Sequence, residues 1–204
     1  MDLHIAWDIG VAGLGARLAS ALDACFIQQA YSRLVIDCNR RPGAADRVPA
    51  ISDGITIPGN TGIDEAGLAA RVEEIHRPYQ ASISDVLDAR ERRGQRSLLV
   101  SLHSFTPALQ AVARPWRFGV LHRGDSSLSS RMLALLRQAL GEAVGDNQPY
   151  AMDAIDYTVP FHADARGLDY LELETRQDLI ADQAGQTETA DFIAGLLAQL
   201  APSS

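Results

Sequence analysis

The sequence has few cysteines and no long apolar run. Cys25 and Cys38 are too few for a disulfide framework, which favours a reducing compartment. Residues 1–4 carry no basic leader, and no stretch approaches the roughly 20 apolar residues of a spanning helix. We therefore expect a cytoplasmic protein with no membrane partner.

Basic residues are also in the minority. The 18 Lys and Arg residues are outnumbered by 26 Asp and Glu residues, which gives a net charge of −8. Such a chain repels polyphosphates unless its basic residues share one face. We expect no nucleic-acid partner, and the sequence leaves the oligomeric state open.

Internal repeats and low-complexity linkers are absent as well, so 204 residues fit a single domain spanning 1–204. Helical and strand-like patterns alternate along it. The patterns predict helices over 12–22, 64–75, 79–87, 127–140 and 187–200, and strands over 25–29, 33–37, 97–103, 117–121 and 169–174. This alternation predicts a three-layer α/β/α sandwich with a mostly parallel, mixed central sheet. The loop over 43–62, rich in Pro, Gly and Asp, is expected to border the site.

In sheets of this class the site lies at the carboxyl ends of strands. Three predicted strand ends carry polar groups, over 37–41, 101–105 and 172–176. Converging, they would supply a cation, an imidazole and carboxylates to one crevice. His103 ends an apolar strand, which suits a zinc ligand because the strand fixes the direction of the ring. Taken alone, His103 could equally be a structural histidine.

Three segments resemble, in order, the core of the N-formylglutamate amidohydrolase family. They are SRLVIDCNR at 32–40, LHSFTP at 102–107, and residues 166–178 with their LETRQD end. Residues 4–8 and 77–79 support the resemblance, which runs from His4 to about Ile180. The family is similar to the zinc carboxypeptidases and aspartoacylases, and the resemblance implies a phosphorylase/hydrolase-like fold. It also implies a Zn²⁺ ion whose bound water attacks an amide carbonyl.

The resemblance assigns the catalytic centre to three residues. Asp8 and His103 would be metal ligands, and Glu174 the general base that takes the proton of the water and protonates the leaving amine. Asp8 could instead cap the first helix. Glu172 and Glu174 share one face of a strand, which could simply be solvated. We prefer Glu174 because it begins the Glu-x-Arg sequence of the family.

Substrate binding is assigned to a second set. Asn39 and Arg40 would clamp a carboxylate of the substrate, since a guanidinium offers two parallel hydrogen bonds to a planar acid. Arg33, predicted as a second catalytic residue beside Glu174, would polarise the scissile carbonyl or bind a second carboxylate, with an ordinary surface charge as the alternative. His162 matches a family position and would line the site, although it could be a loop histidine without a role.

The sequence departs from the family at its start. Family members begin with a strand followed by a histidine that is expected to ligate the metal, and that segment is absent here. We expect the first strand and one ligand to be missing because the chain is truncated or its start misassigned. The alternatives are that His4 substitutes as a ligand, or that the protein is no longer an enzyme.

The predicted function is zinc-dependent hydrolysis of an N-formyl or N-acyl acidic amino acid, such as N-formyl-L-glutamate, to formate and glutamate. Its substrate would be a small molecule bearing a carboxylate. The alternatives are a catalytically silent carboxylate-binding protein and a zinc deacylase or amidase acting on a different substrate.

Overall fold

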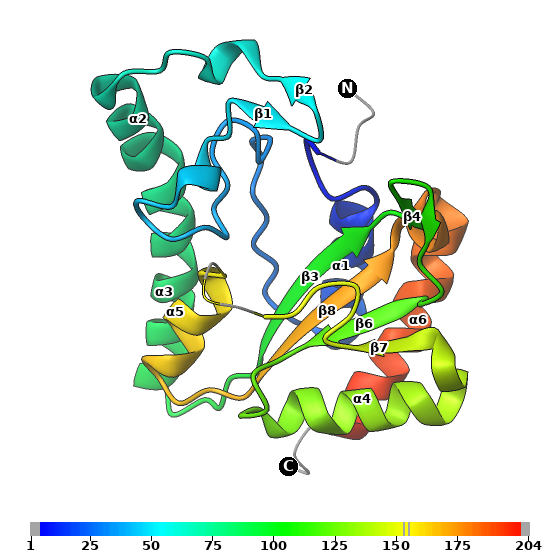
Figure 1. Cartoon of the computed structure of the whole chain (residues 1–204). Helices are drawn as coiled ribbons and strands as arrows, with labels where there is room; N and C mark the ends of the chain where they lie inside the picture. Colours follow the sequence, from blue (N-terminus) through cyan, green and yellow to red (C-terminus); the bar gives the residue numbers. More distant parts are fainter. Residues whose placement is uncertain (1–4, 153, 155, 201–204) are drawn as a thin grey trace. The chain divides into compact units, whose positions relative to one another are not determined.

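A computed structural model describes residues 5–152, 154 and 156–200 of the chain (Figure 1). The chain divides into two compact units. Unit 1 comprises residues 1–7, 27–97 and 153–168, and unit 2 comprises residues 8–26, 98–152 and 169–204. Each unit is described by itself, and the expectation of one amidohydrolase-like domain stays a prediction.

Unit 2 contains a four-stranded sheet in the order β3-β8-β6-β7. Its strands are β3 (Leu99–Phe105), β6 (Phe118–Leu121), β7 (Val144–Asp146) and β8 (Tyr170–Arg176). β3 pairs with β8 and β6 with β7 in parallel, whereas β6 and β8 are antiparallel. The predicted α/β class with a mostly parallel, mixed sheet flanked by helices is therefore confirmed.

The core of unit 2 lies between this sheet and three helices, α1 (Val11–Leu22), α4 (Ser127–Leu140) and α6 (Gln183–Leu200) (Figure 1). Alternate residues of β8, Leu171 and Leu173, are fully buried in that core together with Leu14 of α1 and Met132 of α4. Because side chains alternate along a strand, the residues between these leucines face the opposite side. α6 begins four residues before the predicted start at Thr187.

The opposite side of β3 and β8 is polar. Register pairs Ser101 with Glu172 and His103 with Glu174, and paired residues of neighbouring strands share a face. We call these four residues the polar face. The sequence prediction that both glutamates point the same way is confirmed.

A loop crosses this side of the sheet where two strands carry glycine. A Cβ on Gly119 would lie 2.0 Å from the carbonyl oxygen of Gln148, and one on Gly145 would lie 2.6 Å from the same atom. Only glycine allows such an approach. The loop after β7 therefore packs directly on the sheet. A hairpin of β4 (Ala108–Leu109) and β5 (Val112–Ala113) follows β3.

Unit 1 is helical with an irregular first half. Its helices are α2 (Glu65–Arg71), the π-helical η3 (Val72–His76), α3 (Arg77–Arg92) and α5 (Thr158–Asp164). Before them come η1 (Ala45–Arg47), the hairpin β1 (Ile51–Ser52) and β2 (Ile55–Thr56), and η2 (Pro58–Asn60). The Asp64 side chain caps α2 by accepting from the Gly67 amide, as predicted. No helix among the described residues is both long and apolar enough to cross a membrane.

The strands predicted over 25–29 and 33–37 are wrong, because neither segment forms one. The apolar run within 33–37 instead folds into turns. Its carbonyl groups accept hydrogen bonds from side chains, that of Leu34 from Asn60 and that of Val35 from Arg71. Side chains distant in the sequence thus satisfy backbone carbonyl groups that a neighbouring strand would otherwise have bonded.

Candidate active site

His103 of the polar face pairs with Asp8, which lies outside the sheet. The Nδ1 atom of His103 lies 2.8 Å from Oδ2 of Asp8, and its Nε2 atom lies 3.1 Å from Oγ of Ser101. Asp8 comes just before α1, and the segment is tied to β3 because the Ser104 hydroxyl donates to the Ile9 carbonyl at 2.9 Å. The structure therefore brings together the two residues predicted to be metal ligands.

The surroundings of His103 favour a positive charge. Burial acts to lower its pKa, but the hydrogen bond and charge of Asp8, together with the charges of Glu172 and Glu174, outweigh burial and raise the pKa to about 10. Carboxylates close to an imidazole stabilise its protonated form. The polar face is consequently a place where a cation is electrostatically favoured.

Both glutamates of β8 are buried. Glu172 is 2% exposed and Glu174 is 5% exposed, so the alternative that they form a solvated strand face is wrong. Buried carboxylates are costly and are usually found where paired or functional. Glu174 is the one in register with His103. Both glutamates act on the charge of His103, so the choice of Glu174 over Glu172 as general base stays a prediction.

In unit 1, the predicted substrate arginines contact aspartates. Arg33 donates to Oδ2 of Asp37 from Nε at 3.1 Å and from Nη2 at 2.7 Å. The Nε atom of Arg40 donates to Oδ2 of Asp46 at 2.8 Å, and its Nη1 atom lies 3.7 Å from Oδ1 of Asp156. A substrate carboxylate that binds Arg40 must therefore compete with Asp46 or use the remaining guanidinium edge.

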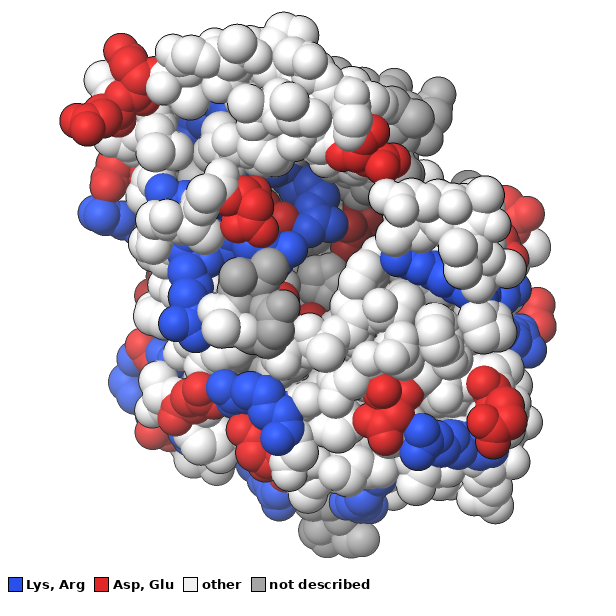
Figure 2. Space-filling model, viewed as in Figure 1, with Lys and Arg blue, Asp and Glu red and all other residues white. Residues whose placement is uncertain are grey.

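These two arginines and three aspartates, Asp37, Asp46 and Asp53, line a cavity of about 390 Å³ in unit 1. The 43–62 loop contributes half of the lining residues, so the loop expected to border the site borders this cavity. Charges of both signs also lie side by side across the face of the molecule seen in Figure 2. The cavity suits a ligand that carries both charges and is not a purely cationic pocket.

Asn39 has a structural role. Its Oδ1 atom accepts from the amides of Tyr157 at 3.2 Å and Thr158 at 2.9 Å, and its Nδ2 atom donates to Asp156 at 3.2 Å. α5 has no capping side chain at its own first residue, so Asn39 caps the helix from 119 residues away. Its contact with a substrate stays a prediction.

His162 lies inside unit 1 with none of its surface exposed. The Nε2 atom of Gln80 donates to the Cys38 carbonyl at 2.8 Å and to Thr158 Oγ1 at 3.2 Å, so the Gln80 carbonyl accepts from His162 Nε2–H at 2.7 Å. Burial, helped by Arg166 and opposed by Asp88, lowers the pKa of His162 to about 4. His162 is thus a buried, neutral hydrogen-bond donor to Gln80, and its contact with a substrate stays a prediction.

Comparison with known proteins identifies the family of the chain. The sequence model of the N-formylglutamate amidohydrolase family matches residues 1–181. The chain therefore belongs to that family, whose members are hydrolases of amide bonds in small molecules. The resemblance found in the sequence is confirmed. No curated protein matches the chain.

Two solved structures are similar. The gene product Atu2144 of Agrobacterium tumefaciens is 34% identical with a TM-score of 0.92, over 97% of this chain and 79% of that one. An N-formylglutamate amidohydrolase from Ralstonia eutropha JMP134 is 19% identical with a TM-score of 0.59, over 94% of this chain and 83% of that one. At 19% identity, the similarity to the Ralstonia eutropha protein is evidence for the fold alone.

Proposed function

We propose that the protein hydrolyses the amide bond of an N-formyl or N-acyl acidic amino acid, such as N-formyl-L-glutamate, with the help of a zinc ion. The products would be formate, or another acid, and the free amino acid. The observation that carries the proposal is the burial of Glu172 and Glu174 next to the Asp8–His103 pair. Membership of an amidohydrolase family supports it.

Two of the predicted ligands have the chemistry that zinc prefers, although among the described residues no group of three or more His, Cys, Asp or Glu side chains could hold a metal ion. Asp8 offers a carboxylate oxygen and His103 an imidazole nitrogen, which are both zinc ligands, and their atoms lie 2.8 Å apart. The same carboxylates that raise the pKa of His103 to about 10 would favour a divalent cation in place of its proton. A bound zinc ion would polarise the amide carbonyl and make water more acidic.

The chain's own residues then move the protons. In this proposal the carboxylate of Glu174 accepts a proton from the attacking water and returns it to the nitrogen of the leaving amine as the amide C–N bond breaks. Its position on a central strand, buried and in register with His103, holds it in one orientation. Glu172 lies two residues before Glu174 on β8, and its charge would keep the local electrostatic potential negative.

Within unit 1, two arginines are the candidates for binding a carboxylate. Arg40 would bind a substrate carboxylate, because its Nη1 atom is anchored on the Asn39 carbonyl at 3.1 Å and the side chain faces the cavity. Arg33, oriented by Asp37, would offer a second cation. We also propose a cytoplasmic location, which the two free thiols, Cys25 and Cys38, support.

The test compares substitutions at two histidines of unit 2, His103 and His122. The purified chain is assayed for bound zinc and for release of formate from N-formyl-L-glutamate, as are His103→Ala and His122→Ala. His122 is a matched control because its Nε2 atom lies 2.9 Å from Oδ1 of Asp146, so it is also a histidine paired with an aspartate.

We expect His103→Ala to lose zinc and at least about 100-fold in turnover, as expected when a metal ligand or acid–base group is removed. His122→Ala should keep both. Turnover that is unchanged in His103→Ala would overturn the proposed site. Turnover that survives removal of all metal by a chelator would overturn the zinc requirement alone.

A further inference from the structure

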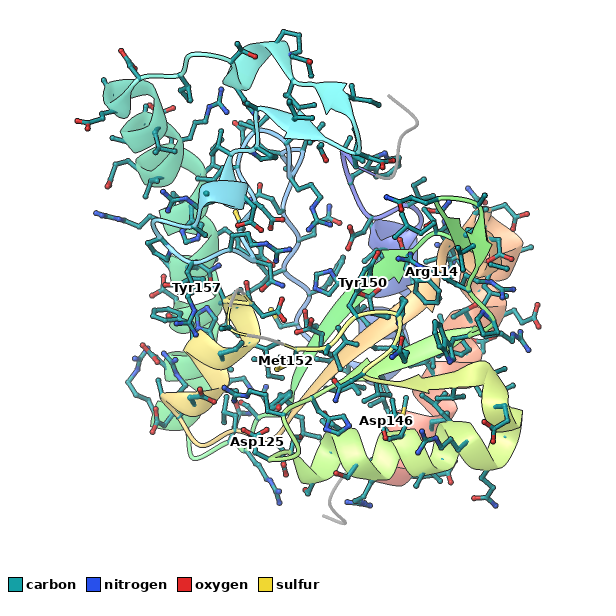
Figure 3. The ribbon with its side chains drawn as sticks, in the orientation of Figure 1. Arg114, Asp125, Asp146, Tyr150, Met152 and Tyr157 are labelled. Atoms are coloured by element: carbon teal, nitrogen blue, oxygen red, sulfur yellow. The ribbon has the colours of Figure 1, made fainter. Side chains whose placement is uncertain are left out.

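Arg114 is a buried arginine held by aromatic rings. It follows β5, and only 8% of its surface is exposed. Its guanidinium carbon lies 4.9 Å from the centre of the Tyr150 ring and 5.9 Å from that of Phe105. Figure 3 shows Arg114 and Tyr150 near the carboxyl end of β3. The two neighbouring rings orient the guanidinium without neutralising its charge.

The hydrogen bonds of Arg114 use one corner of the guanidinium. Its Nη1 atom donates to Oγ1 of Thr106 at 3.1 Å and to the Thr106 carbonyl at 3.5 Å. Among the residues that the structure describes, neither Nε nor Nη2 has an acceptor, and no carboxylate pairs with the side chain. The Nε–Nη2 edge, the one that binds a carboxylate through two parallel hydrogen bonds, is therefore open.

Arg114 belongs to the side of the sheet that carries the polar face. It packs on Phe105, which lies two residues after His103 on β3 and so points to the same side. Tyr150 comes two residues after Gln148, which packs on the glycines of β6 and β7. Arg114 therefore contacts one ring from the sheet, that of Phe105, and one from the loop after β7, that of Tyr150.

Burying a cation without a counter-ion costs free energy. A buried arginine of this kind therefore suggests a binding role. Arg33 and Arg40 are already matched by Asp37 and Asp46. Arg114 differs, because rings and a threonine orient it while its carboxylate-binding edge is left open. An anion that completes this edge would restore the charge balance that buried arginines require.

We propose that Arg114 is a specificity-determining residue that binds the side-chain carboxylate of the acidic substrate through its Nε–Nη2 edge. Tyr150 acts as a positioning residue that holds the guanidinium plane. The identity of the substrate rests on the proposed function, whereas the prediction of a carboxylate rests on Arg114 itself. The enzyme would prefer N-acyl derivatives of acidic amino acids over those of neutral ones.

The experiment measures binding apart from turnover. L-glutamate and glutarate are titrated calorimetrically into the wild-type chain, Arg114→Gln, Arg114→Lys and Arg123→Gln. Arg123 is the matched control, because its guanidinium carbon lies 6.0 Å from the Tyr170 ring centre but its Nη2 atom is paired with Asp125 at 3.0 Å. Inorganic phosphate serves as the probe for an unspecific anion site.

We expect Arg114→Gln to weaken glutamate binding at least tenfold and Arg114→Lys to weaken it less, because an ammonium keeps the charge but loses the fork. Arg123→Gln should bind like the wild type. In turnover, Arg114→Gln should raise the KM for N-formylglutamate with little change in kcat, and should leave the KM for N-formylmethionine unchanged.

Three results would overturn the inference. These are glutamate binding that is equal in Arg114→Gln and the wild type, phosphate binding as tight as glutamate binding, and a wild type that binds no carboxylate. If Arg114→Gln does not fold, Arg114→Lys and Tyr150→Leu carry the same comparison, with thermal melting as the check on folding. A wild type that binds glutamate through Arg114 but hydrolyses no N-acyl amino acid would refute the proposed function and leave this inference standing.

Discussion

Arginines and carboxylates are distributed differently in the two units. In unit 1, Arg33, Arg40 and Arg166 each have a nitrogen between 2.6 and 2.8 Å from an aspartate oxygen. In unit 2, the carboxylates of the polar face surround His103, and Arg114 is held by aromatic rings. Unit 1 pairs these arginines with aspartates, whereas unit 2 has ion pairs such as that of Arg123 with Asp125 and also an arginine held among aromatic rings.

The difference separates charges that maintain structure from charges that are available for chemistry. A matched pair with exposed partners contributes little free energy, but it fixes the orientation of a side chain. Buried carboxylates gathered around one imidazole are costly, and such sites are where perturbed pKa values and function coincide. We infer that the reactive groups lie in unit 2, whereas the ion pairs of unit 1 fix the orientation of its own arginines.

The largest expected effect comes from Glu174→Gln, which removes the proposed base and keeps the shape of the side chain. We expect kcat for N-formylglutamate to fall about 10²- to 10⁴-fold, the usual loss for a general acid–base group. Glu172→Gln is the matched control on the same strand face, and its loss should be at least tenfold smaller. Steady-state kinetics of both variants, with zinc content measured in parallel, shows which glutamate acts as the general base. Equal losses would mean that the two glutamates act as one electrostatic unit.

A middle-sized effect is expected from pH, through His162 in unit 1. Its pKa is lowered from 6.5 to about 4, so between these values the unfolded chain binds more protons than the native one. Stability then rises with pH across that interval, is complete above about 6.5, and is lost as pH falls toward 4. The lost contribution amounts to about 3 kcal/mol, at roughly 1.4 kcal/mol for each pH unit.

His162→Gln should remove this dependence, because an amide can still donate to Gln80 but does not titrate in this range. Urea unfolding of both proteins at several pH values from 4.5 to 7.5 measures it, and the other titrating groups cancel in the difference. The wild type should lose about 2 to 3 kcal/mol more than the variant over that range. Parallel curves would show that His162 is charged or solvated in the native protein.

The sequence predicted the parts of the fold whose patterns are local and long. The helix over 12–22, the strand over 97–103 and the helix over 127–140 correspond to α1, β3 and α4, with ends shifted by at most two residues. The three-residue β7 and the seven-residue α5 were missed. β7 is too short to show a period, and α5 is capped by Asn39 from a distant part of the chain.

The candidate site was predictable where motifs carry it. Asp8, His103 and Glu174 were found because strand ends and family segments point to them, and the structure places them in one unit. Arg114 was not found, because it lies in no motif and the rings that define its role come from Phe105 and from Tyr150 beyond two further strands. Tertiary contacts, not residue type, distinguish it from the other arginines.

The smallest effect is expected from Asp46→Asn, which tests one of the arginine–aspartate pairs of unit 1. This change removes the carboxylate at the Nε atom of Arg40, while the Asn39 carbonyl still anchors Nη1. Because the side chain of Asp46 is 50% exposed, the pair should contribute no more than about 1 kcal/mol to stability.

The freed edge of Arg40 should lower the KM for N-formylglutamate about two- to fivefold, because a substrate carboxylate no longer competes with Asp46. Asp53→Asn changes another carboxylate that lines the same cavity and should not lower the KM to the same extent. A KM that rises in Asp46→Asn would mean that Asp46 holds Arg40 in its binding position. The aspartates of unit 1 would then support the site instead of competing with the substrate for it.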